Sequence, residues 1–121
     1  MIRSETTDRV AVLTIDRQER RNALNLEALE ALDAAMAAAI DDGVAAVIIR
    51  GEGGHFCAGA DLKELEDVAF TQRLRVMLDH LAALPFPVIA AIDGSCMGLG
   101  MQLALACDLR VATDAARFAV P

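Results

Sequence analysis

The sequence predicts an α/β fold with a mostly parallel sheet, and three observations support this class. Short apolar runs rich in β-forming residues alternate with amphipathic segments of helical period along the chain. The runs at 44–49 and 88–92 are continuously apolar, which is typical of strands buried on both faces of a parallel sheet. Each of these two runs leads into a glycine-containing turn and then into a helical segment, as the crossovers of a parallel sheet require.

Composition limits the class of protein further. The 121 residues are 55% hydrophobic and 24% charged, which is the composition of a folded domain, and the length favours a single domain. The net charge is −7. Because nucleic-acid-binding domains carry a basic face or stripe, this balance excludes a nucleic acid partner.

The chain begins with an expected β-hairpin followed by a helix. Residues 2–6 are expected to pair with the β-rich run Val10–Ile15, and a polar loop over 17–22 follows. Asn25 is the expected N-cap of a helix over 26–40. The apolar residues of this helix recur at helical spacing, namely Leu29, Leu32, Met36 and Ile40.

Two glycine turns follow the buried strands at 44–49 and 88–92. The first turn leads through Gly59 to Leu62, where an acidic helical stretch is expected, and the second leads through Gly98 and Gly100. Glycine lets the backbone approach a ligand closely, and the first N–H groups of a helix have no partner inside that helix. Two such groups that converge on one oxygen would form an oxyanion hole. The alternative is that both turns only let helices pack closely on the sheet.

The remaining elements are short. Leu74, Met77, Leu78, Leu81 and Leu84 mark the apolar face of another helix, which two prolines, Pro85 and Pro87, terminate. A short apolar helix is expected over 101–106, and two last strands over 109–112 and 117–120.

Three cysteines, Cys57, Cys96 and Cys107, lie inside apolar runs without the spacing of metal ligands, so no metal site is expected. Free buried cysteines favour a reducing, cytoplasmic location. The N-terminus has no apolar signal region, and no apolar stretch reaches membrane-spanning length without a charge or a proline, so no membrane insertion is expected.

Four blocks, 23–25, 56–62, 87–94 and 103–112, follow one another in the order and spacing of one family. In these blocks the chain resembles the crotonase superfamily of enoyl-CoA hydratases and isomerases. The resemblance implies a spiral of β-β-α units, an acyl-CoA pocket, and assembly as a homotrimer or a hexamer. It also implies that residues 1–121 form the N-terminal portion of a single crotonase-like domain whose C-terminal part is absent.

The resemblance assigns catalytic positions. The thioester oxygen would be held by the backbone N–H groups of Ala60 and Leu99, where the family commonly has glycine at the second position. Gln102 occupies the position of the first of the two glutamates that hydratases use, and a carboxamide does not exchange protons usefully near neutral pH. The second glutamate would follow Pro121.

The resemblance also assigns a site for CoA, which enters as the thioester substrate; no other cofactor is implied. Arg21 would contact a phosphate, although an arginine on a polar loop equally suits a plain surface. The residues expected to line the groove for adenine and pantetheine are Ala23, Ala58, Ala60, Asp61 and Leu62.

Other titratable residues are interpreted as structural. Asp61 suits a helix cap as well as chemistry, and Asp108 a structural contact at the start of a strand. Two histidines, His55 in a loop and His80 in mid-helix, are read the same way. The acidic run Glu64, Glu66 and Asp67 is interpreted as a solvated face.

The leading hypothesis is an enoyl-CoA hydratase-type lyase that adds water to a 2-enoyl-CoA in fatty-acid or acyl-CoA metabolism. Gln102 keeps two alternatives open: an acyl-CoA-binding protein that does not hydrate, and another crotonase reaction such as isomerisation, hydrolysis or decarboxylation.

Overall fold

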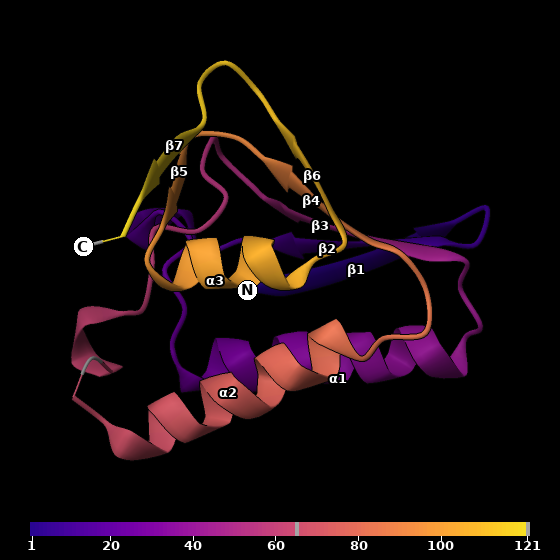
Figure 1. Ribbon diagram of the computed structural model, residues 1–121, viewed down its shortest axis with the longest axis horizontal. Helices are drawn as coiled ribbons and strands as arrows, with labels where there is room; N and C mark the ends of the chain where they lie inside the picture. The colour runs from indigo at the N-terminus through magenta and orange to yellow at the C-terminus, as the bar shows by residue number, and fades with distance from the viewer. Residues whose placement is uncertain (65, 121) are drawn as a thin grey trace.

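The computed structural model describes residues 1–64 and 66–120, and this part of the chain contains two sheets (Figure 1). The larger sheet has the strand order β1-β2-β3-β4-β6, and only β1 and β2 pair in antiparallel fashion. Its strands are β1 (Ile2–Thr7), β2 (Val10–Ile15), β3 (Ala46–Gly51), β4 (Val88–Ile92) and β6 (Leu109–Ala112). The smaller sheet pairs β5 (Ser95–Met97) with β7 (Arg117–Ala119). The predicted α/β class with a mostly parallel sheet is confirmed.

Three α-helices accompany the sheets in the described residues: α1 (Leu26–Asp41), α2 (Val68–Ala82) and α3 (Leu99–Ala106). The predicted cap at Asn25 is confirmed, because its side chain accepts a hydrogen bond from the N–H of Ala28 at 2.9 Å. Figure 1 shows α1 and α2 side by side; α1 packs on β1 and β2, and α3 lies against α2 and β5. None of these helices combines the length and apolar character needed to cross a membrane.

The core lies on one face of the larger sheet. Leu13, Ile49 and Ala90 lie in register on neighbouring strands and are fully buried with the apolar face of α1. One residue earlier on each strand, Val12, Ile48 and Ile89 are only half-buried. The expectation of strands buried on both faces is therefore wrong in this chain: burial alternates along β3 and β4 with the period of two that side chains have in a strand.

A β-β-α pattern recurs in the structure. β4 enters the larger sheet, β5 follows in the smaller sheet, and α3 comes next. β3 precedes Cys57, which bridges to Cys96 on β5, and α2 comes later. Likewise β6 in the larger sheet is followed by β7 in the smaller one. Successive strands therefore pass from one sheet to the other, as a spiral of β-β-α units does.

Several predicted boundaries differ from the structure. The strand expected at 44–49 runs from Ala46 to Gly51, because its pairing with β2 begins at Val10. The helical stretch expected from Leu62 is a 3-10 turn over Leu62–Glu64, and α2 begins at Val68. The loop at 17–22 contains a 3-10 turn over Gln18–Arg20. β5 was not predicted at all.

Candidate functional site

The two glycine turns lie beside each other at the carboxyl ends of β3 and β4. The N–H groups of Phe56 and Cys57 donate to the carbonyl of Ser95 at 3.1 and 3.0 Å, and the N–H of Met97 donates to the carbonyl of Cys57 at 3.1 Å. These bonds join the segment before Ala60 to the segment before Leu99. The predicted convergence of the two turns therefore has a direct structural basis.

Gly100 lets α3 approach the first turn. A Cβ atom at this position would lie 2.2 Å from the carbonyl oxygen of Cys57, which is far inside contact distance. Gly98, just before the helix, has a φ of +53°, a conformation that L side chains rarely adopt. Both glycines are thus needed for the position of the α3 N-terminus.

Several backbone N–H groups at this junction, including those of Ala60 and Leu99, have no hydrogen-bond acceptor among the described residues. Around Ala60, the N–H of Leu24 donates to Gly59 and the N–H of Asp61 donates to Leu24, whereas the N–H of Ala60 is unpaired. Leu99 is the first residue of α3, and its N–H is unpaired in the same way. Both N–H groups are therefore available to a ligand oxygen.

Ala60 and Leu99 line one cavity of about 560 Å³. Its walls are mainly apolar and come from the first turn, α2 and α3. The lining residues are Ala58, Gly59, Ala60, Leu62, Glu64, Phe70, Thr71, Leu74, Gly98, Leu99 and Gln102. An apolar cavity lined by two residues with unpaired N–H groups suits a carbonyl compound that carries an apolar chain, because weak dielectric screening strengthens a hydrogen bond to the oxygen.

Three polar residues, Gln102, Glu64 and Thr71, also line this cavity. Gln102 and Leu99 both lie on α3 and line this cavity, and Gln102 is exposed, so the predicted catalytic position is an exposed carboxamide at the cavity wall. Glu64 is half-buried, and its carboxylate accepts a bond of 3.4 Å from the N–H of Leu26 at the start of α1. The interpretation of Glu64 as part of a solvated face is wrong. Its neighbours Glu66 and Asp67 are exposed, and Asp67 caps α2.

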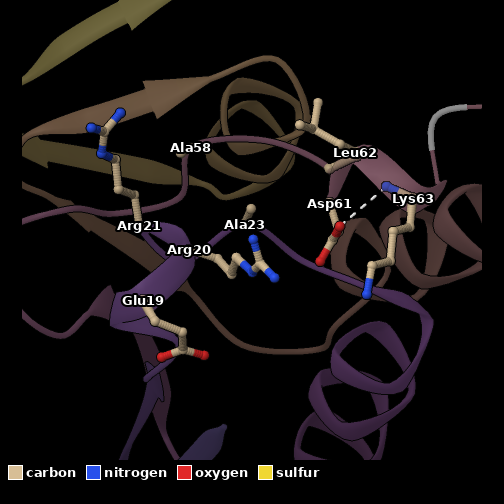
Figure 2. Close-up of a pocket in the computed structure, with 9 residues that line it drawn as sticks. Glu19, Arg20, Arg21, Ala23, Ala58, Asp61, Leu62 and Lys63 are labelled. Atoms are coloured by element: carbon tan, nitrogen blue, oxygen red, sulfur yellow. Dashed lines mark hydrogen bonds between the residues drawn. The ribbon is translucent and has the colours of Figure 1, made fainter.

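A second cavity, of about 530 Å³, adjoins the first and shares Ala58, Ala60 and Leu62 with it (Figure 2). Arg20, Arg21 and Lys63 bring positive charge to its lining. The full set of lining residues is Glu19, Arg20, Arg21, Ala23, Ala58, Ala60, Asp61, Leu62 and Lys63. All six residues predicted to bind CoA therefore line this one cavity, and its three basic residues suit phosphate groups.

Asp61 is buried at the edge of this second cavity. Its carboxylate accepts a hydrogen bond of 2.8 Å from the guanidinium of Arg17 and one of 3.1 Å from the N–H of Lys63 (Figure 2 shows the second). The Arg17 hydrogen bond, followed by the Lys63 N–H, holds the pKa of Asp61 below its usual range. Asp61 is therefore a charged, fully engaged carboxylate at neutral pH, and its expected role as a cap holds for the 3-10 turn at Leu62–Glu64.

The remaining candidates have structural partners. Nδ1 of His55 accepts the N–H of Ser95 at 3.1 Å, and Nδ1 of His80 lies 2.9 Å from the carboxylate of Asp33. The predicted structural contact of Asp108 is confirmed, since its carboxylate accepts the N–H of Val88 at 2.8 Å.

The three cysteines are free and buried, as expected. Burial raises the pKa of Cys57 and Cys107 to about 12 and that of Cys96 to about 11, so the thiols are unreactive at neutral pH.

Comparison with known sequences gives a consistent result. A family model described as enoyl-CoA hydratase/isomerase matches residues 5–121. The chain is 44% identical to the Mycobacterium tuberculosis protein named "Probable enoyl-CoA hydratase echA6", over 95% of this chain and 49% of that protein. It is 42% identical to the mitochondrial methylglutaconyl-CoA hydratase of Homo sapiens, over 89% of this chain and 34% of that protein. The chain spans about half or less of the length of these curated relatives.

Solved structures resemble the chain equally well. An enoyl-CoA hydratase/isomerase from Xanthobacter autotrophicus Py2 matches with a TM-score of 0.93 and 40% identity, covering 99% of this chain and 48% of that one. A protein from Mycobacterium thermoresistibile, described as a "probable enoyl-CoA hydratase", matches with a TM-score of 0.92 and 36% identity, covering 99% and 52%.

Proposed function

Since this chain belongs to the enoyl-CoA hydratase/isomerase family, we propose that it binds an acyl-CoA thioester and polarises its carbonyl with the backbone N–H groups of Ala60 and Leu99. The observation that carries the proposal is the pair of unpaired N–H groups in one apolar cavity. The adjoining cavity with Arg20, Arg21 and Lys63 would take the phosphate-bearing part of CoA.

In this proposal the two N–H groups act on the thioester oxygen in the transition state. Addition of a nucleophile at the β-carbon of a 2-enoyl thioester moves negative charge onto that oxygen. Removing one donor of an oxyanion hole typically costs about 2.7 to 4 kcal/mol of transition-state stabilisation. The apolar walls formed by Phe70 and Leu74 would hold the acyl chain and exclude water from the oxyanion.

The first candidate reaction is the addition of water to a 2-enoyl-CoA. It is tested by the hydration of crotonyl-CoA, followed through the loss of the enoyl thioester absorbance, with the full-length protein. Turnover well above the buffer rate supports a hydratase. A rate equal to that of buffer overturns the hydratase assignment and leaves thioester binding to be tested separately.

The second candidate is acyl-CoA binding without hydration, and Gln102 is the observation that favours it. General acid–base catalysis contributes about 10²- to 10⁴-fold per group, and a carboxamide in the cavity cannot supply it. Calorimetric titration with a long-chain acyl-CoA distinguishes the candidates, because tight binding with no turnover supports the second. Absence of binding overturns both.

We further propose a homotrimer or hexamer located in the cytoplasm. The family assignment supports the oligomer, and the three free buried thiols support a reducing compartment. Light scattering and cell fractionation of the full-length protein test the two points.

A further inference from the structure

An ion pair between Arg17 and Asp61 joins the two walls of the second cavity. The guanidinium Nη2 lies 2.8 Å from a carboxylate oxygen of Asp61, and the two side chains are only 14% and 8% exposed. Arg17 follows β2, whereas Asp61 follows the first glycine turn. The pair therefore connects parts of the chain that are 44 residues apart.

Arg17 makes a second contact to the opposite wall. Its Nη1 donates to the carbonyl of Ala23 at 2.8 Å, and its own backbone N–H donates to the side chain of Asn22 at 2.8 Å. The rigid fork of a guanidinium allows this simultaneous grip on a carbonyl and on a carboxylate, which a lysine could not reproduce. Arg17 thus fixes the loop that carries Ala23 against the turn that carries Asp61.

Two backbone hydrogen bonds join the loop after Ala23 to the residues on either side of Ala60. The N–H of Leu24 donates to the carbonyl of Gly59 at 2.9 Å, and the N–H of Asp61 donates to the carbonyl of Leu24 at 2.8 Å. Ala60 lies between these two bonded residues, so any shift of Asp61 rotates or displaces the peptide that carries the Ala60 N–H. The ion pair is therefore one residue away from that donor.

Burial makes the pair a costly way to stabilise a fold. Removing two charges from water carries a desolvation penalty that their attraction often fails to exceed, and apolar replacements are frequently as stable. Neither side chain lines the larger cavity, in which the two unpaired N–H groups lie. The desolvation cost of the ion pair and its absence from the larger cavity both fit a role in positioning the backbone rather than in contacting the carbonyl.

We propose that Arg17 and Asp61 are positioning residues that set the place of the Ala60 N–H relative to the Leu99 N–H. Thioester polarisation then depends on an ion pair that does not touch the carbonyl. This inference rests on the proposed function, because the carbonyl enters only through it.

The test compares two ion pairs of the same chemistry in the full-length protein. Asp61→Asn removes the charge, and Arg17→Lys keeps the charge but removes the fork. Asp33→Asn is the matched control, since Asp33 lies 2.8 Å from Arg73 and is 13% exposed, and lines a different cavity. The probe is 4-dimethylaminocinnamoyl-CoA, whose absorption moves to longer wavelength when its carbonyl is polarised.

We expect Asp61→Asn and Arg17→Lys to reduce the wavelength shift of the bound probe and to weaken its binding by about tenfold, the loss of one charge-assisted hydrogen bond. Asp33→Asn should lower the melting temperature but leave the shift and the affinity unchanged. If the probe bound to Asp61→Asn and to Arg17→Lys shows the same wavelength shift as with the wild type, the positioning role is overturned, whatever the stability of the variants.

A wild-type protein that neither binds nor shifts the probe contradicts the proposed function instead. Hydrogen exchange without ligand then decides the inference separately. In Asp61→Asn, the backbone amides of residues 20–24 and 58–62 should both lose protection from exchange. In Asp33→Asn, neither segment should lose protection. Unchanged protection at both segments, or loss at one alone, overturns it.

Discussion

At the scale of single residues, Gln102 decides which reaction the cavity supports. It lines the larger cavity together with Leu99, where a carboxylate would be able to take or give a proton. We predict that Gln102→Glu raises crotonyl-CoA hydration by about 10²-fold or more, which is the usual contribution of one acid–base group. The measurement is the steady-state rate of wild type and variant under identical conditions.

Gln102→Asn is the matched control, because it keeps the carboxamide and should gain nothing. If Gln102→Glu binds acyl-CoA as the wild type does and yet shows no gain, the cavity lacks another element of the reaction.

Asp61 gives the fold a defined pH dependence. The hydrogen bond from Arg17 holds the pKa of Asp61 below its unfolded value, so the folded state favours the charged carboxylate. Its contribution is therefore complete above the unfolded pKa of about 3.9 and is lost as the pH falls through the lower folded pKa. We predict that Asp61→Asn lowers the free energy of unfolding at pH 7 by about 1.5 to 3 kcal/mol.

Denaturant unfolding of wild type and Asp61→Asn at pH 7 and at progressively lower pH measures this. The difference between the two proteins should stay constant down to about pH 4 and shrink below it. A difference that does not change with pH would contradict the charge-based explanation.

At the scale of elements, the packing of α3 on the first glycine turn sets the site. A methyl group at Gly100 would meet the carbonyl of Cys57, which is backbone and cannot move aside like a flexible side chain. We predict that Gly100→Ala destabilises the fold by about 1 to 3 kcal/mol and displaces the α3 N-terminus, so that probe polarisation by Leu99 decreases. Chemical unfolding and the absorption of the bound probe measure the two effects.

Gly43→Ala is the control for Gly100→Ala. Gly43 has a φ of +64° and open space around its Cβ direction, so the substitution introduces backbone strain without a collision. It should cost stability and leave the probe spectrum unchanged. Equal spectra for both variants would show that α3 does not set the position of the Leu99 N–H.

Periodicity made most elements predictable, and non-local contacts account for what was missed. α1 could be predicted from the helical spacing of its apolar residues and from the Asn25 cap. β4 could be predicted from an apolar run that two prolines precede and a glycine follows. β5 is three residues between two glycines, and its strand character comes from pairing with β7 and with Cys57. No local pattern carries that information.

In the candidate site, too, local sequence patterns predicted some features, and others depend on contacts between distant parts of the chain. The turns at Gly59 and Gly98 and part of the lining of both cavities could be named in advance, because the four sequence blocks are so specific, whereas the walls from Phe70, Thr71 and Leu74 could not. The burial of Glu64 depends on the N-terminus of α1, 38 residues earlier in the chain, and the partner of Asp61 on the loop after β2. Residue type and spacing do not predict the burial of Glu64 or the partner of Asp61.

At the scale of the whole molecule, apolar side chains remain exposed on the last third of the chain. β6 is the final strand of the larger sheet, and Leu109 and Val111 on it are 57% and 63% exposed. Leu105 on α3 and Phe118 on β7 are exposed as well. Unpaired strand edges and contiguous apolar surface promote association.

We predict that the 121-residue chain expressed by itself self-associates in a concentration-dependent manner, measured by sedimentation velocity. The double substitution Leu109→Glu and Val111→Glu should reduce the association, because it places charge on the edge strand. Val76→Glu, at an exposed position on α2, is the control and should have little effect. A single monomeric species at all concentrations would contradict this prediction.

The order of strands in the larger sheet has a consequence for synthesis. Each strand of β1-β2-β3-β4-β6 is added beside the one before it, and none is inserted between two earlier strands. A chain that leaves the ribosome from its N-terminus therefore offers every new strand a partner that is already available. The walls of the second cavity would emerge first, and the larger cavity would gain its wall from α3 only when this helix has left the exit tunnel.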